Sequence, residues 1–569
     1  MTDVQTETPA APEVAVAPKA NPVAWPLGLA GVVLVIVGSF LSWSYDGTIL
    51  NDLSIDFFPG GLQILAIVIA VLSLVLLLAA KGPLAALGSW LDATLGLRTF
   101  GTGLVLYMAL VLVAISVESE GLINVNPGGY VTLVGALLIA VSGWLLPLRQ
   151  LRNMKAAKLP GWVDILAIAV LMGSLLFLAA YALGLEDAWS FILCLVFIAT
   201  AATGLFRTGA MSWVAQAGQR NRKVLTLASF AVAFLFPFTQ DGSDANMSIA
   251  TSVLVFAATA MGLNIVVGLA GLLDLGYIAF LGSGAYVAAT LSQSAFATIG
   301  WKPPFLVVVL VGALVAMLLG LVIGSPTLRV SGDYLAIVTL GFGEIFRFAM
   351  FNLDGNNGPN LTNGPNGIPG IPDLELFGFN FGAVHHPFGI ELGRFSNYYF
   401  LLLILTGGVI LVFSRLNNSR IGRGWVAIRE DEKAAEAMGV NVFGLKLLAF
   451  AVGAFLAGLA GTIKAHQDGA VSPDQYIFLE SAFLLAAIVL GGMGTIAGVL
   501  LGATILKLLP EKLRFFSEYR LLLFGITLVL MMRFRPEGLV ASRRRQLEFH
   551  EDDEHLAEVV ENELVEEAK

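Results

Sequence analysis

A charged segment, Arg420–Lys446, separates two apolar runs, Tyr398–Phe413 and Leu445–Ile463. We place Ala427–Met438 on a helix at about 100° per residue. One face of this helix then carries Arg429, Glu432, Lys433 and Glu436. The opposite face carries Ala427, Ala434 and Met438, with Asp431 intruding. Gly439 supplies a stop, because glycine tolerates the left-handed C-cap conformation. The pattern predicts a short amphipathic helix at a membrane surface with its charged face toward water, and the simplest interpretation is a solvated interfacial helix.

Two further places carry ionisable groups next to apolar runs. In Gly262–Tyr286, Asp274 and Gly276 lie among several glycines, which allow close helix packing or broken helices that line a cavity. Asp274 is then either the cap of a tight hairpin or a functional group at membrane depth. In Gly332–Phe351, Glu344 and Arg347 are three residues apart and share a helix face. They form either a clamp between helices or the lining of a polar path.

The segment Asn352–Asn397 is long and rich in Gly, Asn and Pro, and contains NGPNGIPGIP. Loops of this length are usually functional or disordered. The many turn-forming residues favour an ordered surface that docks an external protein or acts as an external gate. Our candidates for lining a path are Asp274, Gly276, Glu344, Arg347, Asn363, Gly364, Asn366 and Gly367.

Composition places most of the chain in a membrane. Of its 569 residues, 57% are hydrophobic and 13% are charged, against about 45–50% and about 25% in soluble proteins. The net charge of −9 owes much to the acidic tail after Glu548. The single cysteine, Cys194, excludes a disulfide within the chain. The histidines lack metal-ligand spacing, and we interpret all five as loop or tail residues: His385, His386, His466, His550 and His555. We therefore predict no metal site and no cofactor in this chain.

Sixteen apolar runs are long enough, or nearly so, to cross a bilayer. They are Pro26–Trp43, Leu62–Ala80, Gly101–Val117, Tyr130–Leu146, Val163–Leu183, Trp189–Phe206, Val224–Phe238, Ala250–Leu272, Gly276–Leu291, Phe305–Ile323, Tyr334–Phe351, Tyr398–Phe413, Leu445–Ile463, Ser481–Leu490, Ile496–Leu508 and Leu521–Met532. The short run Ser481–Leu490 forms either a span or, with Ile496–Leu508, a re-entrant hairpin. The predicted fold class is all-α and polytopic, with about 16 transmembrane helices.

The loop charges predict the orientation, because cytoplasmic loops carry an excess of Lys and Arg. The basic connections are Arg149–Lys158, Arg207–Lys223, Arg415–Lys433 and Arg533–Arg545. Counting crossings puts all of them on the same side as both termini, so both termini and Arg420–Lys446 are predicted to be cytoplasmic. The clearest exception is Pro510–Arg520, which carries three basic residues on the outer side.

We divide the chain into four parts. Residues 1–24 lack the features of a secretory signal and are predicted to be a disordered cytoplasmic tail. Residues 25–207 form a membrane extension of about six plain helices without an assigned role. Residues 220–536 form the core that carries the glycine motifs and the ionisable groups. Residues 543–569 form an acidic cytoplasmic tail.

Several motifs of the core resemble one family. Gly262–Tyr286, Gly332–Phe351, NGPNGIPGIP, Gly422–Ala465 and Leu479–Ala503 together resemble the branched-chain amino-acid ABC transporter permeases of the LivM type. The similarity covers about Val224–Arg535. It implies one of two permease subunits of a bacterial importer in the cytoplasmic (inner) membrane.

The resemblance also implies partners and a coupling loop. The partners are a second, LivH-like permease subunit, two cytoplasmic ATP-binding subunits that hold ATP and magnesium, an extracytoplasmic amino-acid-binding protein and the lipid bilayer. Residues 420–446 correspond to the loop that docks on the ATPase, where such permeases carry an EAA-x-x-x-G pattern. This chain has Lys433 at the position of the glutamate. The implied coupling residues are Arg423, Arg429, Glu430, Asp431, Glu432, Lys433, Ala434, Ala435 and Gly439.

Other functions fit the sequence less well than this one. The chain has no G-x-x-x-x-G-K-[ST] phosphate loop, so energy must come from another polypeptide. Its basic residues flank membrane helices, which disfavours nucleic-acid binding. Import of urea or short amides by the same architecture is one alternative. An ion-coupled secondary transporter that uses Asp274, Glu344 and Arg347 as a relay is another. A membrane-embedded enzyme has the least support, because no catalytic cluster is present.

Overall fold

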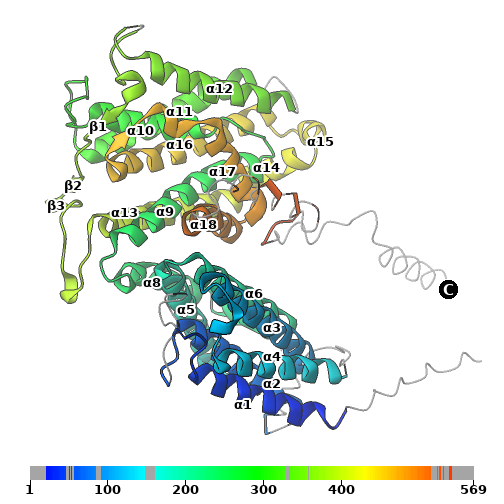
Figure 1. The fold of residues 1–569 in the computed structure, drawn as a ribbon. Helices are drawn as coiled ribbons and strands as arrows, with labels where there is room; N and C mark the ends of the chain where they lie inside the picture. Colours follow the sequence, from blue (N-terminus) through cyan, green and yellow to red (C-terminus); the bar gives the residue numbers. More distant parts are fainter. Residues whose placement is uncertain are drawn as a thin grey trace, which may run out of the picture. The chain divides into compact units, whose positions relative to one another are not determined.

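A computed structural model gives the fold (Figure 1). It describes residues 21–45, 50, 53, 57–81, 83–84, 91–147, 160–327, 333–356, 358–513, 519, 522, 525–526, 529–530, 533 and 537–540. The chain forms two compact units, Met1–Ala233 and Phe234–Lys569. The predicted tails 1–24 and 543–569, the loops Arg149–Lys158, Pro510–Arg520 and Arg533–Arg545, and the run Leu521–Met532 lie wholly or largely outside the described residues.

The first unit is a bundle of helices. Its elements are α1 (Ala24–Phe40), α2 (Gly61–Lys81), α3 (Ala93–Glu118), η2 (Leu122–Asn124), α4 (Pro127–Leu145), α5 (Gly161–Gly184), α6 (Ala188–Arg207), α7 (Ala210–Arg220) and α8 (Arg222–Leu235), whose last residues belong to the second unit. Helix α7 occupies most of the predicted loop Arg207–Lys223. It is too polar to register as an apolar run, which is why the hydropathy pattern missed it.

Small residues bring α1 and α4 together at backbone distance. A Cβ on Gly31 would lie 2.7 Å from the Gly135 carbonyl, and a Cβ on Gly135 would lie 2.8 Å from the Gly31 carbonyl. Such close approach increases van der Waals contact where lipid supplies no hydrophobic driving force. The seam therefore explains why these two helices pack closely.

The second unit contains the predicted core from Phe234 onward, whereas residues 220–233 of that core belong to the first unit. Its elements are η3 (Phe236–Thr239), α9 (Asp244–Asn264), the π-helical turn η4 (Ile265–Leu269), α10 (Ile278–Leu291), α11 (Phe305–Thr327), α12 (Asp333–Asn352), η5 (Gly364–Asn366), β1 (Ile368–Pro369), β2 (Glu375–Leu376), β3 (Phe379–Asn380), η6 (Pro387–Gly389), α13 (Arg394–Asn417), α14 (Arg420–Glu430), α15 (Glu432–Ala437), α16 (Val442–Asp468), β4 (Ala470–Val471), η7 (Pro473–Tyr476), α17 (Phe478–Gly491) and α18 (Ile496–Lys512). Strand β1 pairs antiparallel with β4, and β2 with β3.

Helices α9 and α16 form the centre of this unit. Helix α9 contacts α13, α16, α17 and α18, and α16 also contacts α10 and α11. Gly284 of α10 and Gly312 of α11 both approach the Gly458 backbone of α16, since a Cβ on Gly284 would clash with the Gly458 carbonyl and a Cβ on Gly458 would lie 3.0 Å from the Gly312 carbonyl. The core side chains around this seam are mostly buried Ala, Leu, Ile, Val and Phe.

The helices α13 and α16 place two predicted functional regions far apart. Helix α13 begins where the 352–397 segment ends, and its last residue, Asn417, lies just before α14. Helix α16 begins after α15 and ends next to β4, which pairs with β1 of the 352–397 segment. In Figure 1, α14 and α15 accordingly lie at one end of this unit and β1–β3 at the other. A 24-residue helix such as α13 spans about 36 Å.

The structure confirms a mostly helical, polytopic chain. Fifteen of the sixteen predicted runs coincide with described helices. The sixteenth, Leu521–Met532, lies largely outside the described residues. Among the described residues, eleven helices are long and apolar enough to cross a membrane, and α1, α10 and α17 are shorter apolar helices. Helices α17 and α18 pack against each other, which fits both the two-span and the hairpin interpretation.

Candidate functional site

The charged segment 420–446 folds into two short helices, so the prediction of one helix over Ala427–Met438 is wrong. The break lies at Asp431, whose backbone is extended at φ −154° and ψ 109°. Its carboxylate accepts hydrogen bonds from Lys433 N at 2.9 Å and Ala434 N at 3.0 Å. Aspartate stabilises the start of a helix in this way, because it satisfies backbone donors that have no partner within the helix. The intruding Asp431 is therefore the N-cap of α15.

The break also changes which residues are buried. Ala435 is the buried alanine of α15, whereas Ala434 is exposed and Met438 is 84% exposed, contrary to the predicted apolar face. The predicted stop is confirmed, because Gly439 follows α15 with φ +83°. The exposed residues from Arg423 to Gly439 are Arg423, Glu430, Asp431, Glu432, Lys433, Ala434, Glu436, Ala437, Met438 and Gly439, and we call them the α14–α15 surface.

Two contacts with buried residues hold this region against α16. The Trp425 side chain is fully buried, and its Nε1–H donates to the Leu445 carbonyl at 2.7 Å. The ammonium of Lys446, in the first turns of α16, lies 2.6 Å from a Glu432 carboxylate oxygen. One contact ties α14 to α16 and the other ties α15 to α16. The α14–α15 surface is thus attached directly to the start of a long apolar helix.

Arg429 does not lie on the solvent face, which corrects the prediction. Its Nη1 donates to the Gly268 carbonyl of η4 at 3.0 Å, and its Nη2 pairs with Glu430 at 2.7 Å. Gly271 makes room for this side chain, because a Cβ there would lie 2.5 Å from Arg429 Cγ. A single continuous helix would place Arg429 on the same face as Glu432 and Glu436. The break at Asp431 instead leaves Arg429 near the end of α14, facing the end of α9.

Sequence reasoning missed the network behind Gly268. The Asn264 side chain is fully buried, and its Oδ1 accepts from Gly494 N at 2.9 Å. Gly494 lies in the connection between α17 and α18, and a Cβ on Gly268 would lie 2.7 Å from Gly494 N. Arg429, Gly268, Asn264 and Gly494 thus connect α14 with α9 and with the α17–α18 connection. The glycine clusters GLAG and GGMG were the available signal.

Asp274 and Gly276 form a packed turn before α10. Asp274 is 1% exposed, and its Oδ1 accepts from Gly276 N at 2.9 Å. A Cβ on Gly276 would clash with the Thr339 carbonyl of α12, and Thr339 Oγ1 accepts from Leu275 N at 3.0 Å. These contacts fit the hairpin-cap interpretation.

Glu344 and Arg347 are paired, and a third residue joins them. Arg347 Nη1 lies 3.5 Å from Glu344 Oε2, whereas Nη2 lies 3.0 Å from Asp474 Oδ1 of η7. The side chains of Arg347 and Glu344 are 25% and 33% exposed. The Arg347–Asp474 ion pair thus clamps the last turns of α12 to η7, whereas the Glu344 pair lies within α12. Nearby Tyr476 is buried, and desolvation raises its pKa well above the ordinary value.

The NGPNG stretch makes a tight turn against β4. Asn363, Gly364 and Gly367 all have positive φ, at 58°, 58° and 65°. The Asn363 side chain donates to the Gly367 carbonyl at 2.8 Å, and Asn366 is exposed. A Cβ on Gly367 would clash with the Val471 carbonyl. The segment is a turn-built surface, as the composition predicted.

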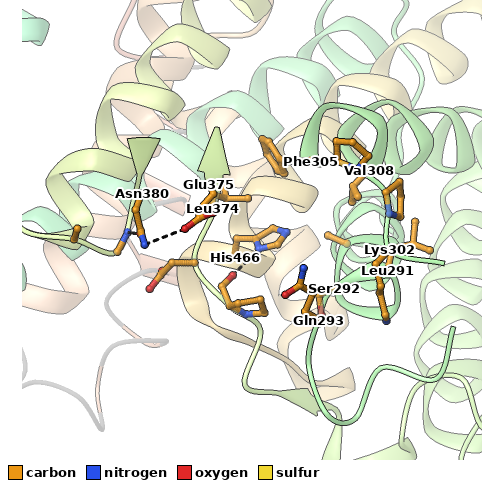
Figure 2. A pocket seen from close by; sticks show the side chains of 17 residues that line it. Leu291, Ser292, Gln293, Lys302, Phe305, Val308, Leu374, Glu375, Asn380 and His466 are labelled. Carbon is orange, nitrogen blue, oxygen red and sulfur yellow. Dashed lines mark hydrogen bonds between the residues drawn. The ribbon is translucent and has the colours of Figure 1, made fainter. Parts of the chain in front are cut away.

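A cavity of about 680 Å³ opens beside this surface (Figure 2). Figure 2 shows Glu375 and Asn380 on one side, Lys302 on the other, and His466 between them with the Phe305 ring next to it. The lining carries the carboxylates of Asp373 and Glu375 as well as the ammonium of Lys302, whose pKa is lowered by desolvation. The cavity lies at the end of the unit opposite to the α14–α15 surface.

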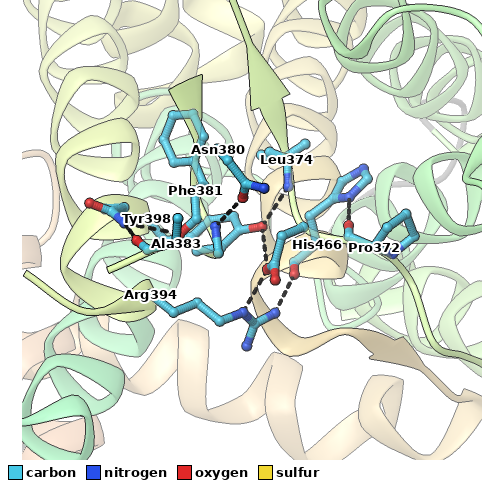
Figure 3. A network of polar contacts seen from close by, with 11 residues as sticks. Pro372, Leu374, Asn380, Phe381, Ala383, Arg394, Tyr398 and His466 are labelled. Atoms are coloured by element: carbon cyan, nitrogen blue, oxygen red, sulfur yellow. Dashed lines mark hydrogen bonds and ion pairs between the residues drawn. The ribbon is translucent and has the colours of Figure 1, made fainter. Parts of the chain in front are cut away.

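A polar network holds the wall of this cavity in place (Figure 3). Arg394 Nε donates to Asp373 Oδ1 at 2.6 Å, and its Nη2 donates to the His466 carbonyl at 3.0 Å. Tyr398 also donates to Asp373 Oδ1, at 3.1 Å. His466 lies in the last turn of α16, not in a loop as predicted, and its Nδ1 is 2.9 Å from the Pro372 carbonyl. The network ties the 352–397 segment to α13 and α16.

Comparison with known proteins identifies relatives for the second unit. The family model described as "Branched-chain amino acid transport system / permease component" matches residues 246–532. The permease protein LivM of the high-affinity branched-chain amino acid transport system of Salmonella typhimurium is 40% identical over 339 residues, 58% of this chain and 77% of the relative. LivM of Escherichia coli is 40% identical over 341 residues, with the same coverage. Escherichia coli LivH is 32% identical over 125 residues, 21% of this chain and 40% of LivH. No solved structure matches the chain.

Proposed function

The chain belongs to the branched-chain amino acid transport permease family, of the LivM type, and from this premise we propose how it works. It is a permease subunit of an ABC transporter for branched-chain amino acids, as the relatives named LivM and LivH indicate. The LivH relatives imply a second permease as its partner. We propose that the two permeases together form the translocation path. No observation favours urea, short amides or ion coupling.

The α14–α15 surface is the proposed contact with the ATPase. The observation that carries this proposal is the combination of an exposed charged face with two contacts to α16: the hydrogen bond from buried Trp425 to Leu445, and the ion pair of Glu432 with the buried ammonium of Lys446. A solvated interfacial helix requires no such anchors. Two cytoplasmic ATP-binding subunits, which hold ATP and magnesium, press on this surface in our proposal. Arg429 and Gly268 then pass the displacement to α9.

The 352–397 segment is the proposed contact with an extracytoplasmic amino-acid-binding protein. Its position at the far ends of α13 and α16 supports this assignment, because a docking surface for the ATPase must lie on the other side of the membrane. We accordingly propose sixteen spans in the cytoplasmic membrane with both termini in the cytoplasm. The loop charges support the same orientation.

The proposed path residues differ in their support. The side chains of Glu344 and Arg347 are partly exposed, so they remain candidates for the path lining. So do Asn363, Gly364, Asn366 and Gly367, which lie at the proposed outer entrance. Asp274 and Gly276 are packed against α12, and we propose that they position α10 and do not contact the substrate.

Co-purification tests the proposed assembly. The tagged full chain, extracted in a mild detergent from cells that express the whole importer, is expected to carry the second permease and the ATP-binding subunits with it. The double reversal Lys433→Glu with Glu436→Lys is expected to lose the ATP-binding subunits and to keep the second permease. Loss of neither subunit, or loss of both, contradicts the assignment of this surface.

A further inference from the structure

A second cavity lies within the helices of the permease unit. Its volume is about 280 Å³, and its walls come from α9, α10, α16, η7, α17 and α18. One part of the lining is apolar and buried: Val255, Phe256, Ile278, Leu281 and Leu484. Pockets for drug-sized ligands measure about 300–1,000 Å³. The cavity is thus suited to a small molecule with an apolar part.

The remaining lining holds two cations and two anions. Lys464 pairs with Asp468 on α16, and Lys507 of α18 lies 3.0 Å from Glu480 Oε2 of α17. Lys507 Nζ also lies 4.6 Å from the centre of the Phe256 ring. The charges sum to zero, and each sign comes from more than one helix. A ligand that carries one positive and one negative group matches this arrangement.

Two buried amide oxygens in the lining point to a ligand that donates hydrogen bonds. Gln467 is 2% exposed, and its Nε2 donates to Thr251 Oγ1 at 2.9 Å. Within the described part of the chain, Gln467 Oε1 and Gln475 Oε1 are buried without a hydrogen-bond partner. A buried acceptor without a donor is unfavourable and is rare in native proteins. An ammonium group carries three donors and no acceptor, which is the chemistry that two such oxygens require.

We propose that this cavity binds the transported molecule as a zwitterionic α-amino acid with a small aliphatic side chain. The ammonium group lies toward the oxygens of Gln467 and Gln475 and the carboxylates, and the ligand carboxylate lies toward Lys464 and Lys507. The side chain packs against the apolar wall around Phe256 and Leu484. That the ligand is an aliphatic amino acid rests on the proposed function. That it carries one positive and one negative group rests on the cavity lining alone.

Direct binding to the purified full chain tests the proposal. L-leucine is titrated in detergent without any partner subunit, and 4-methylpentanoate and 3-methylbutylamine, which lack the ammonium or the carboxylate, are titrated in parallel. We expect saturable binding of leucine and at least tenfold weaker binding of both analogues. Gln467→Met and Lys507→Met should each raise the Kd for leucine at least tenfold. Arg220→Gln, which breaks an ion pair with Asp164 in the first unit, is the matched control and should leave the Kd unchanged.

The outcomes separate this inference from the proposed function. Equal binding of leucine and its singly charged analogues, or unchanged Kd values in well-folded variants, overturns the zwitterion site. So does leucine uptake by the reconstituted importer at the wild-type maximal rate in both variants. Failure of the wild-type importer to take up any branched-chain amino acid contradicts the proposed function. If the chain then still binds another zwitterion in the cavity, the charge pattern holds and only the substrate assignment fails.

Discussion

At the scale of single residues, the direction of a side chain decides its role. Arg429 and Arg423 both belong to α14 and both look solvent-facing in the sequence. Only Arg423 is exposed, whereas the Arg429 side chain is 22% exposed and bonds the Gly268 carbonyl. Composition predicted a charged surface here. It did not predict that one of the charges reaches back to α9, because that contact depends on the break at Asp431.

The first prediction concerns Arg429. Replacing it by Gln removes a charge-assisted hydrogen bond, and such bonds contribute about 1.5–3 kcal/mol to the free energy of unfolding. Because the Arg429 side chain is partly exposed, we expect Arg429→Gln to lower the free energy of unfolding by about 1.5 kcal/mol. Thermal unfolding of the purified chain measures the change. Arg423→Gln is the matched control and should leave the midpoint unchanged. Equal effects of the two substitutions would show that the contact to Gly268 contributes nothing.

The second prediction concerns the Arg347 cluster. Partly exposed ion pairs contribute about 0–1 kcal/mol, so the cost of 3–5 kcal/mol typical of an unpaired buried charge does not apply here. Double-mutant cycles with Arg347→Gln should give a larger coupling energy to Asp474→Asn than to Glu344→Gln, because the contact to Asp474 is 3.0 Å and that to Glu344 is 3.5 Å. The unfolding midpoints of the single and double variants supply the cycles. A larger coupling to Glu344 would reverse our assignment of the main partner.

At the scale of elements, much of the architecture follows from the sequence. Apolar runs and their flanking charges predicted the positions of fifteen described helices, because hydropathy records burial in lipid directly. The sequence analysis missed one short helix and merged two others, because their boundaries depend on a few residues and not on a long apolar run. Helix α7 has no apolar run, and the α14–α15 break depends on one capping carboxylate. The ion pair between Arg347 and Asp474 joins residues 127 positions apart, which no local pattern reveals.

The third prediction concerns the turn at Gly367, where the 352–397 segment packs against β4, the strand that follows α16. Gly367 and Gly370 have similar φ values, 65° and 68°, but only Gly367 approaches another backbone, at Val471. Alanine at either position bears a backbone strain of about 1–2 kcal/mol, and at Gly367 it also clashes with the Val471 carbonyl. Gly367→Ala should therefore lower the unfolding midpoint more than Gly370→Ala. Equal midpoints would show that the β1–β4 contact is not constrained.

At the scale of the whole molecule, the assignment requires that two surfaces of the second unit lie on opposite sides of a membrane. Single cysteines placed in a Cys194→Ala background test the fourth prediction. In intact cells, an impermeant thiol reagent should label Asn366→Cys and should not label Lys433→Cys until the cells are lysed. Both residues are exposed, so accessibility within the chain does not limit labelling. Labelling of Lys433→Cys before lysis would reverse the proposed orientation.

The central claim is that the α14–α15 surface transmits ATPase motion and does not select substrate. Its most direct test is leucine uptake by vesicles that contain the complete importer, measured together with the stimulation of ATP hydrolysis by the binding protein. Gly439→Pro imposes a negative φ where the chain needs +83°, and Lys433→Glu with Glu436→Lys reverses the exposed charges. Both variants should lose uptake and stimulation, while the binding protein keeps its affinity for leucine. Normal stimulation with transport of a different substrate would contradict the account and would place this surface in the translocation path.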